Sequence, residues 1–329
     1  MIKKIPVLLV IVIVVTLFLG CSASESTDPI ALVPQRANML GHINLSEILQ
    51  DKELTGIYDR ALENSENPQT VKGALDNLKD ENGIDLRDFQ GGIFFADLSD
   101  SSIEESGYSG AIVRGTFDTN KLIDSIKEAS ENGIIVTEYK GYTIYSYELE
   151  EMAFVFVGNY ILVIGPMDVV KDVIDVKKGD KKAVGGKVLD NYNKLGDVLV
   201  KIAAEVPADV AEERLEDSED ELPADLSSFA DIRTIGLSMT KKQQSIALNL
   251  QLCAVDSDSA EAIEQTIEGM LAFIQLLGSF SDDPEAAEGL LSPLEDLDIS
   301  RSGSCVTINL DMTFSEIEGL IAEGLGQLE

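Results

Sequence analysis

Histidine and tryptophan are nearly absent from this chain of 329 residues, which has one histidine, His42, and no tryptophan. A single imidazole removes most of the usual repertoire of general bases and transition-metal ligands. Aromatic residues make up only 6% of the chain, which argues against a surface that stacks bases or sugar rings. These shortages predict a protein that is not an enzyme and that needs no cofactor.

Basic residues are also few. Lysine and arginine number 25 against 59 aspartates and glutamates, for a net charge of −34. Such a charge repels phosphate backbones and no basic stripe offsets it, so we expect no nucleic-acid partner. Apolar residues, by contrast, make up 44% of the chain. That share is sufficient for one large core or two smaller ones.

Cysteine occurs three times, and the first, Cys21, follows an apolar run from Ile5 to Gly20. Lys3 and Lys4 precede this run. Two basic residues, an apolar stretch and a small residue are typical of a secretory signal. The run is shorter than the roughly 20 residues that span a bilayer as a helix. We therefore predict a signal peptide over residues 1–20, with an uncleaved anchor helix as the alternative.

The sequence Phe18-Leu19-Gly20-Cys21-Ser22 resembles the lipobox of prokaryotic lipoproteins, with Gly20 and Cys21 matching its pattern. The resemblance implies a diacylglycerol on the sulfur of Cys21 and attachment to the outer face of the cell membrane or the cell envelope. Two acyl chains suffice for stable anchoring, since each buried methylene contributes about 0.8 kcal/mol. Residues 21–30 are small and polar, and they predict a flexible tether between lipid and folded part.

The rest of the chain alternates strand and helix patterns in two stretches. We expect a first α+β unit over residues 31–204, an acidic linker over 205–228 and a second α+β unit over 229–329. Both units run strand, strand, helix, strands, helix, which indicates a degenerate internal duplication. Successive hairpins predict antiparallel sheets with the helices packed on one face, the α+β class.

Local signals mark several ends of elements. Gly158-Asn159 between two apolar runs predicts a hairpin with a two-residue loop. Asp118 and Asp258 stand at the starts of the two equivalent helices, and Asp258 with Glu261 matches a capping box. Thr313 with Glu316 predicts the same cap for the last helix.

Three stretches are similar to segments of a broad group of prokaryotic envelope proteins of unknown function. They are Ala31-Leu32-Val33-Pro34, the stretch from Asn82 to Gly92, and Val157-Gly158-Asn159-Tyr160 followed by a helix. This resemblance implies location and architecture, and no activity.

Few residues suggest chemistry. Ser238 and Lys241 match the Ser-x-x-Lys pattern of serine acyl-enzymes, but that chemistry needs a helix and these residues end a predicted strand. His42 has no second histidine to act with. Asp97 with Asp100, and Asp282 with Asp283, could bind a divalent cation weakly, as acid-rich loops often do. We predict no catalytic residue and no metal site.

The triplet Asn44-Leu45-Ser46 is an acceptor pattern for N-glycosylation. Asn44 or Ser46 also suits the first position of the helix expected there, and capping is the favoured interpretation.

Cys253 and Cys305 each lie in a predicted strand whose apolar residues all have even numbers. Both cysteines therefore point to the polar face of a sheet. Export would place them where disulfides form, and with Cys21 acylated two cysteines remain. A disulfide between Cys253 and Cys305 requires that the two strands be neighbours.

Three hypotheses of function follow. The first is a membrane-anchored extracytoplasmic lipoprotein, a non-catalytic module that binds or organises a component of the envelope. The second is a carrier of an apolar ligand such as a lipid, because a sheet with a helical cover can enclose one. The third is a metal-dependent hydrolase built from carboxylates. The partner, whether a protein or an apolar ligand, is not identified by the sequence.

Overall fold

The computed structural model describes residues 28–61, 70–82, 85–99, 107–116, 118–129, 133–147, 152–211, 226–278, 294 and 297–326. These residues form two compact units. The first unit takes the described residues up to Ala37, those in His42–Thr55 and those in Gln69–Gly185. The second takes those in Asn38–Gly41, Gly56–Pro68 and Gly186–Glu329.

The boundary between the units differs from the one expected near residues 205–228. Strand β8 (Val200–Glu205) pairs antiparallel with β9 (Ile232–Lys241), so hydrogen bonding ties it to the second unit. Helix α7 (Gly186–Lys194) packs on β8 and follows it there. Residues 212–225 of the expected linker lie outside the described residues, as do the predicted signal peptide and residues 21–27 of the tether.

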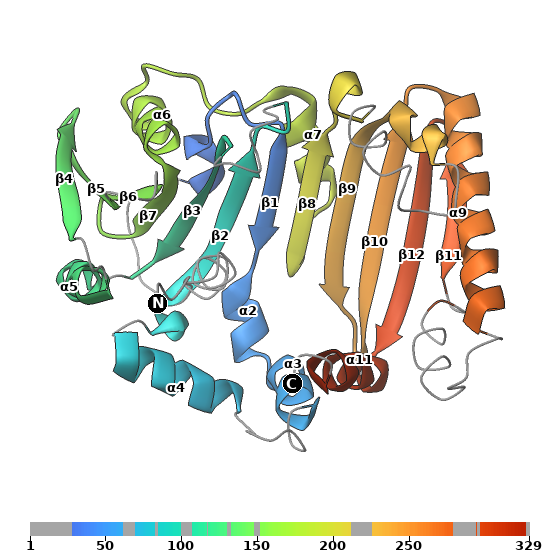
Figure 1. Cartoon of the computed structure of the whole chain (residues 1–329), viewed down its shortest axis with the longest axis horizontal. Coiled ribbons are helices and arrows are strands. Elements are labelled where there is room, and N and C mark those ends of the chain that lie inside the picture. Colours follow the sequence, from blue (N-terminus) through green and yellow to red (C-terminus); the bar gives the residue numbers. More distant parts are fainter. Residues whose placement is uncertain are drawn as a thin grey trace, which may run out of the picture. The chain divides into compact units, whose positions relative to one another are not determined.

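The first unit contains an antiparallel sheet with the strand order β2-β3-β7-β6-β5-β4 (Figure 1). Its strands are β2 (Phe89–Ala96), β3 (Ser109–Gly115), β4 (Ile134–Tyr139), β5 (Tyr142–Tyr147), β6 (Met152–Val157) and β7 (Ile161–Pro166). Its helices are η1 (Pro29–Leu32), α2 (Leu45–Gln50), α4 (Val71–Asn82), η2 (Leu86–Asp88), α5 (Thr119–Ala129) and α6 (Met167–Lys178). Helix α3 (Lys52–Ala61) begins in the first unit and ends in the second.

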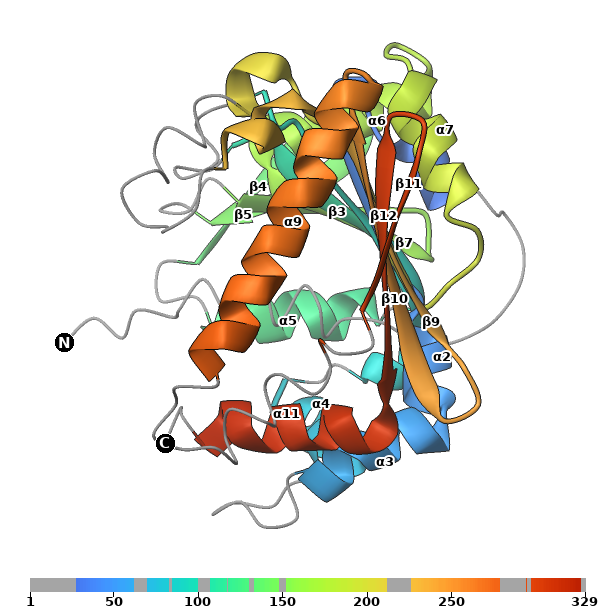
Figure 2. The same ribbon diagram turned by 90° about the vertical axis from the view of Figure 1, so that its right-hand side faces the viewer.

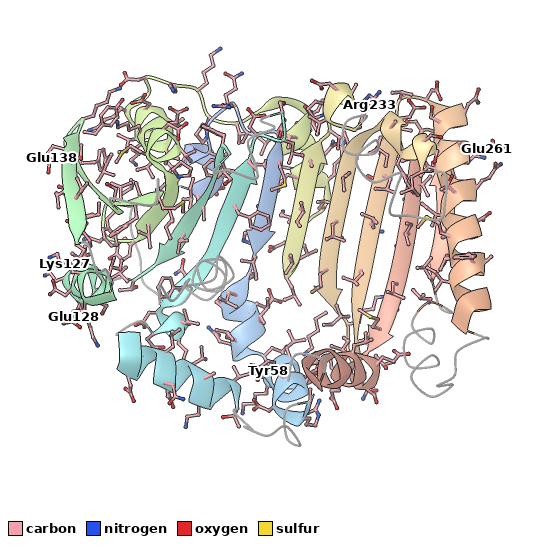
Figure 3. The ribbon with its side chains drawn as sticks, in the orientation of Figure 1. Tyr58, Lys127, Glu128, Glu138, Arg233 and Glu261 are labelled. Atoms are coloured by element: carbon pink, nitrogen blue, oxygen red, sulfur yellow. A yellow bond between two sulfur atoms is a disulfide. The ribbon has the colours of Figure 1, made fainter. Side chains whose placement is uncertain are left out.

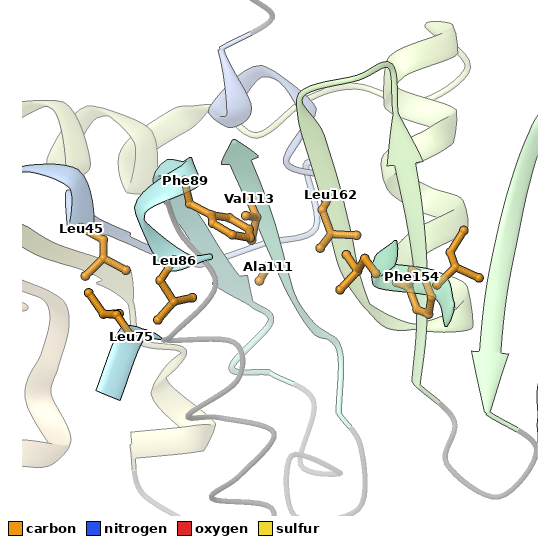
Figure 4. Packing of buried hydrophobic residues seen from close by; sticks show 10 residues of the cluster. Leu45, Leu75, Leu86, Phe89, Ala111, Val113, Phe154 and Leu162 are labelled. Atoms are coloured by element: carbon orange, nitrogen blue, oxygen red, sulfur yellow. The ribbon is translucent and has the colours of Figure 1, made fainter. Parts of the chain in front are cut away.

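One face of this sheet is covered by α2, α4 and α5. Successive side chains of a strand point to opposite faces, so each strand contributes alternate residues to this core. Ala111 and Val113 come from β3, and Leu162 comes from β7 (Figure 4). The covering helices add Leu45, Leu75, Leu122 and Ile123.

The opposite face is covered by α6. Its Val169, Val170, Val173 and Ile174 are fully buried. A Cβ on Gly110 or Gly165 would lie 2.8 Å or 3.1 Å from a methyl carbon of Val169, so glycine at both positions lets the helix approach the strands. Helices therefore cover both faces of the first unit, which differs from the single covered face that we expected. Helix α6 follows β7 directly and packs on the face opposite α5, where Val169 contacts Gly110 and Gly165.

The second unit contains strands in the order β11-β12-β10-β9-β8, followed by β1 (Met39–Ile43), whose first residues belong to this unit. The remaining elements are η4 (Ser227–Asp231), β10 (Ser245–Ala254), α9 (Ser257–Gly278), β11 (Asp298–Ser302), β12 (Cys305–Thr313) and α11 (Phe314–Gly326). Helix α9 lies on one side of these strands and α7 on the other (Figure 2). Ala260 and Ile263 of α9 pack with Leu252 and Val306 in this unit's core.

The two units repeat one topology, which fits the internal duplication expected from the sequence. The order β2-β3-β7-β6 corresponds to β9-β10-β12-β11, and a helix follows the second strand and the last strand in each case. The antiparallel α+β class is thereby confirmed. The hairpin β4–β5 is the difference, since it has no counterpart among the described residues of the second unit.

Local predictions had mixed outcomes. Asp118 caps α5, accepting a hydrogen bond from the Lys121 amide at 3.1 Å. The capping box of Thr313 and Glu316 is confirmed, since the Thr313 amide donates to Glu316 Oε2 at 2.6 Å. The predicted box at Asp258 is wrong, because α9 starts earlier and Asp256 accepts from the Ser259 amide at 2.8 Å. The hairpin predicted at Gly158-Asn159 forms between β6 and β7, but its loop has three residues instead of two, since Val157 pairs with Ile161.

Candidate functional site

A connected group of polar contacts lies on and around α6 in the first unit. Valines and an isoleucine form the buried side of this helix, and Asp172 and Asp175 stand at its border. Gly179 ends the helix in a left-handed conformation, φ 79°, and its amide donates to the carbonyl oxygens of Asp175 and Val176. The chain then turns back, bringing Asp180 and Lys181 beside the helix.

The tip of the β4–β5 hairpin is bound to this helix end. Lys140 Nζ lies 2.6 Å from Asp175 Oδ1 and 2.6 Å from Asp180 Oδ2. The hydroxyl of Tyr139 donates to Asp175 Oδ1 at 3.0 Å. Asp175 is buried, at 8% exposure, so its carboxylate needs these partners.

A second group of contacts lies further along the same helix. Tyr108, which is buried, donates its hydroxyl hydrogen to Asp172 Oδ2 at 3.1 Å, and Lys181 forms an ion pair with the same carboxylate. The Arg36 guanidinium lies 4.2 Å from the centre of the Tyr108 ring and donates to Asp97 Oδ2 at 2.7 Å. We call these two groups of residues together the α6 network: Arg36, Asp97, Tyr108, Tyr139, Lys140, Asp172, Asp175, Asp180 and Lys181.

The pKa values of three groups in the α6 network, Tyr108, Lys140 and Asp175, move away from neutrality. Burial and the neighbouring Asp172 raise the pKa of Tyr108, so its hydroxyl stays protonated. Hydrogen bonds to Asp175 and Asp180 raise the pKa of Lys140, so its ammonium stays charged. Burial pushes the pKa of Asp175 upward, but the hydrogen bonds from Lys140 and Tyr139 outweigh it and lower the pKa overall.

These protonation states limit what the α6 network can do. General acid–base catalysis works best with a group whose pKa lies near the operating pH, and a lysine nucleophile needs a lowered pKa. Here the pKa values of Tyr108 and Lys140 are raised and the pKa of Asp175 is lowered, so none of the three moves toward neutral pH. The arrangement is suited to holding the β4–β5 hairpin and the loop after α6 in one geometry.

Sequence reasoning did not find the α6 network. Which helix lies over which hairpin is decided by the tertiary fold, so the sequence offered no signal that links them.

Two of the residues singled out from the sequence, His42 and Asn44, lie at the junction of β1 and α2. His42 is in β1, half buried, with Nδ1 inaccessible to solvent. Asn44 caps α2, accepting a hydrogen bond from the Glu47 amide at 3.4 Å. Its side-chain nitrogen donates to Glu47 Oε2 at 2.8 Å. Glycosylation of Asn44 would replace this contact, and capping is the role that the geometry supports.

Ser238 and Lys241 are not brought together. Both lie in β9, where their positions in the strand place them on opposite faces. Lys241 Nζ instead lies 5.9 Å from the centre of the Phe314 ring. Asp97 belongs to the α6 network, whereas Asp100, Asp282 and Asp283 lie outside the described residues.

Cys253 and Cys305 face each other across the β10–β12 pair and are joined by a disulfide. Cys21 lies outside the described residues. In the described part of the chain, no three histidine, cysteine, aspartate or glutamate side chains are grouped so that they could hold a metal ion. No helix among the described residues has the length and hydropathy needed to cross a membrane.

No protein-family model and no curated protein matches this chain. The crystal form III structure of TP0453 is similar, with a TM-score of 0.50 and 11% identity over 91% of this chain and 100% of that chain. Crystal form I of TP0453 gives a TM-score of 0.45 and 11% identity, covering 92% and 99% of the two chains. Crystal form IV gives 0.46 and 12%, covering 90% and 97%. At these identities the likeness concerns the fold alone.

Proposed function

We propose that this protein is a non-catalytic binding module, held at the outer face of a membrane by a lipid on Cys21, that binds or organises a component of the cell envelope. The observation that carries the non-catalytic part is the state of the α6 network. Its charged groups are bound to one another, and the pKa values of Tyr108, Lys140 and Asp175 move away from neutrality. Such a network stabilises a surface rather than transferring protons.

The anchoring part rests on the sequence around Cys21. Replacing Cys21 by alanine should abolish incorporation of radiolabelled fatty acid or isoprenoid, because the acceptor sulfur is gone. The matched control is Cys253→Ser, which also removes a cysteine and should keep the label. Label that persists in Cys21→Ala, or that never enters the unaltered protein, would show that Cys21 is not the lipid acceptor, and Ile5–Gly20 would then be the anchor helix.

A second candidate function, the carrier of an apolar ligand, is favoured by one observation in the second unit. Phe273 and Ile274 of α9 are 43% and 41% exposed, although both are large and apolar. Leu248, Leu250 and Leu310 of the sheet are only half buried. Native mass spectrometry after gentle extraction separates the two functions, since a carrier would retain a bound lipid and a protein-binding module would not.

A further inference from the structure

Strand β4 is the last strand of the first unit's sheet, and its hydrogen-bonding pattern follows from the adjacent turn. Lys140 and Gly141 have φ angles of 49° and 83°, the two positive values of a type I′ turn. In such a two-residue hairpin the closing pair, here Tyr139 and Tyr142, exchanges hydrogen bonds. Hydrogen-bonded and non-bonded pairs then alternate along the ladder.

The alternation directs the main-chain groups of Ile134, Val136 and Glu138 away from β5. No strand in the described part of the chain pairs with this side of β4. The side chains beside it are also exposed, Ile135 at 45% and Val136 at 55%, one on each face of the sheet. Strand β4 thus offers three outward backbone positions bordered by apolar side chains.

Proteins protect exposed edges with charge, proline, bulges or very short strands. Strand β11, the edge of the second unit's strands, carries Asp298 and Arg301, and Arg301 is bound to Glu261 and Glu264 of α9. Strand β4 has the sequence Ile-Ile-Val-Thr-Glu-Tyr, pairs with β5 in unbroken register and contains neither lysine nor proline. Strand β11 therefore carries two charged side chains, one of them bound to α9, whereas β4 carries a single charged residue, Glu138, at the end next to the turn.

The α6 network holds this edge in place. Tyr139 and Lys140 are bound to Asp175 and Asp180, so the end of the hairpin is fixed to the helix. A strand that is already ordered loses little conformational freedom when another strand joins it. The hairpin is also the element that the described part of the second unit lacks.

We infer that β4 is a docking edge for an extended segment of another protein that alternates apolar and basic residues, joining the sheet by strand addition. Main-chain hydrogen bonds to Ile134, Val136 and Glu138 would provide affinity, and contact with Ile135 and Val136 would favour apolar side chains. The exposed carboxylate of Glu138 on this strand (Figure 3) and the net charge of −34 favour a basic segment. The same charge opposes pairing with a second copy. The inference rests on the proposed binding function and names its partner's chemistry.

The test uses the full-length protein in detergent and a short synthetic peptide that alternates lysine and valine. Amide hydrogen exchange at Ile134, Val136 and Glu138 should be fast without peptide. At a peptide concentration of about ten times Kd it should slow about tenfold, because exchange then occurs only from the unbound fraction. A control peptide that is N-methylated at every residue keeps the side chains but lacks the backbone N–H donors on both edges, and it should not protect.

Two variants at one position complete the test. Val136→Pro removes an amide that points away from β5, so the hairpin should keep its fold and lose the protection by peptide. Val136→Thr keeps the backbone amide and should retain most of the protection by peptide. Protection by the N-methylated peptide, or unchanged protection in Val136→Pro, would overturn the inference. So would protection that rises with protein concentration in the absence of peptide, which would identify a second copy as the occupant. Any of these three outcomes removes the proposed partner from this edge and leaves the anchored, non-catalytic function to be judged by the lipid label.

Discussion

Removing the disulfide should lower the free energy of unfolding by about 4 kcal/mol, the entropy that a cross-link of this loop length removes from the unfolded chain. Cys253 and Cys305 are 52 residues apart in sequence and directly opposite each other in the β10–β12 register. The double variant Cys253→Ser, Cys305→Ser keeps both strands and loses only the link. Urea unfolding measures the difference.

The control for this prediction is the reductant. A reducing agent should bring the unaltered protein to the stability of the double variant and should not change the double variant. Equal stability of the oxidised protein and the double variant would contradict the prediction. Two titratable thiols in the denatured, unreduced protein would show that the bond does not form.

The second large effect is expected at Gly110, where the sheet of the first unit meets α6. A Cβ at this position would lie 2.8 Å from Val169 Cγ1, 2.9 Å from Phe95 Cζ and 3.1 Å from the Ile164 carbonyl oxygen. All three neighbours are held by the core, so the helix must move away from the strands. We expect Gly110→Ala to cost about 3 kcal/mol by overpacking.

Gly269 supplies the matched control. It lies inside α9, and no atom is within 4 Å of the Cβ that alanine would add. Gly269→Ala should raise stability by about 0.5–1 kcal/mol, since alanine favours helix more than glycine does. Urea unfolding of both variants decides the question. A Gly110→Ala variant as stable as the unaltered protein would mean that α6 does not pack as closely as described.

The sequence predicted the elements whose signals are local. The cap at Thr313 and the strands around Cys253 and Cys305 follow from patterns within a few residues. Strand β8 and the preceding helix α7 were not predicted, and for β8 the reason is that Lys201 interrupts its apolar pattern. In the folded protein Lys201 is buried, with Nζ 4.1 Å from the centre of the Tyr192 ring of α7 and 2.5 Å from the Gly196 carbonyl oxygen. Only a tertiary partner makes that lysine compatible with a buried strand.

The candidate site lay almost wholly beyond the reach of the sequence. Asp175 is one of 59 acidic residues, and nothing near it in sequence distinguishes it from the others. Its role comes from Lys140 on a hairpin that the fold brings to the end of α6. The expectation that all helices lie on one face was wrong for a similar reason. The face on which α6 packs depends on tertiary contacts, such as those of Val169 with Gly110 and Gly165.

The central claim is that the protein acts by binding from an anchored position and performs no proton transfer. Complementation of a strain that lacks this protein tests it most directly, with variants that remove candidate acid–base groups and preserve packing. His42→Ala, Ser238→Ala and Asp172→Asn should each restore whatever the deletion impairs, whereas Cys21→Ala, folded but without its lipid, should not. Complete failure of His42→Ala, Ser238→Ala or Asp172→Asn, in a protein shown to be folded and lipid-labelled, would contradict the account.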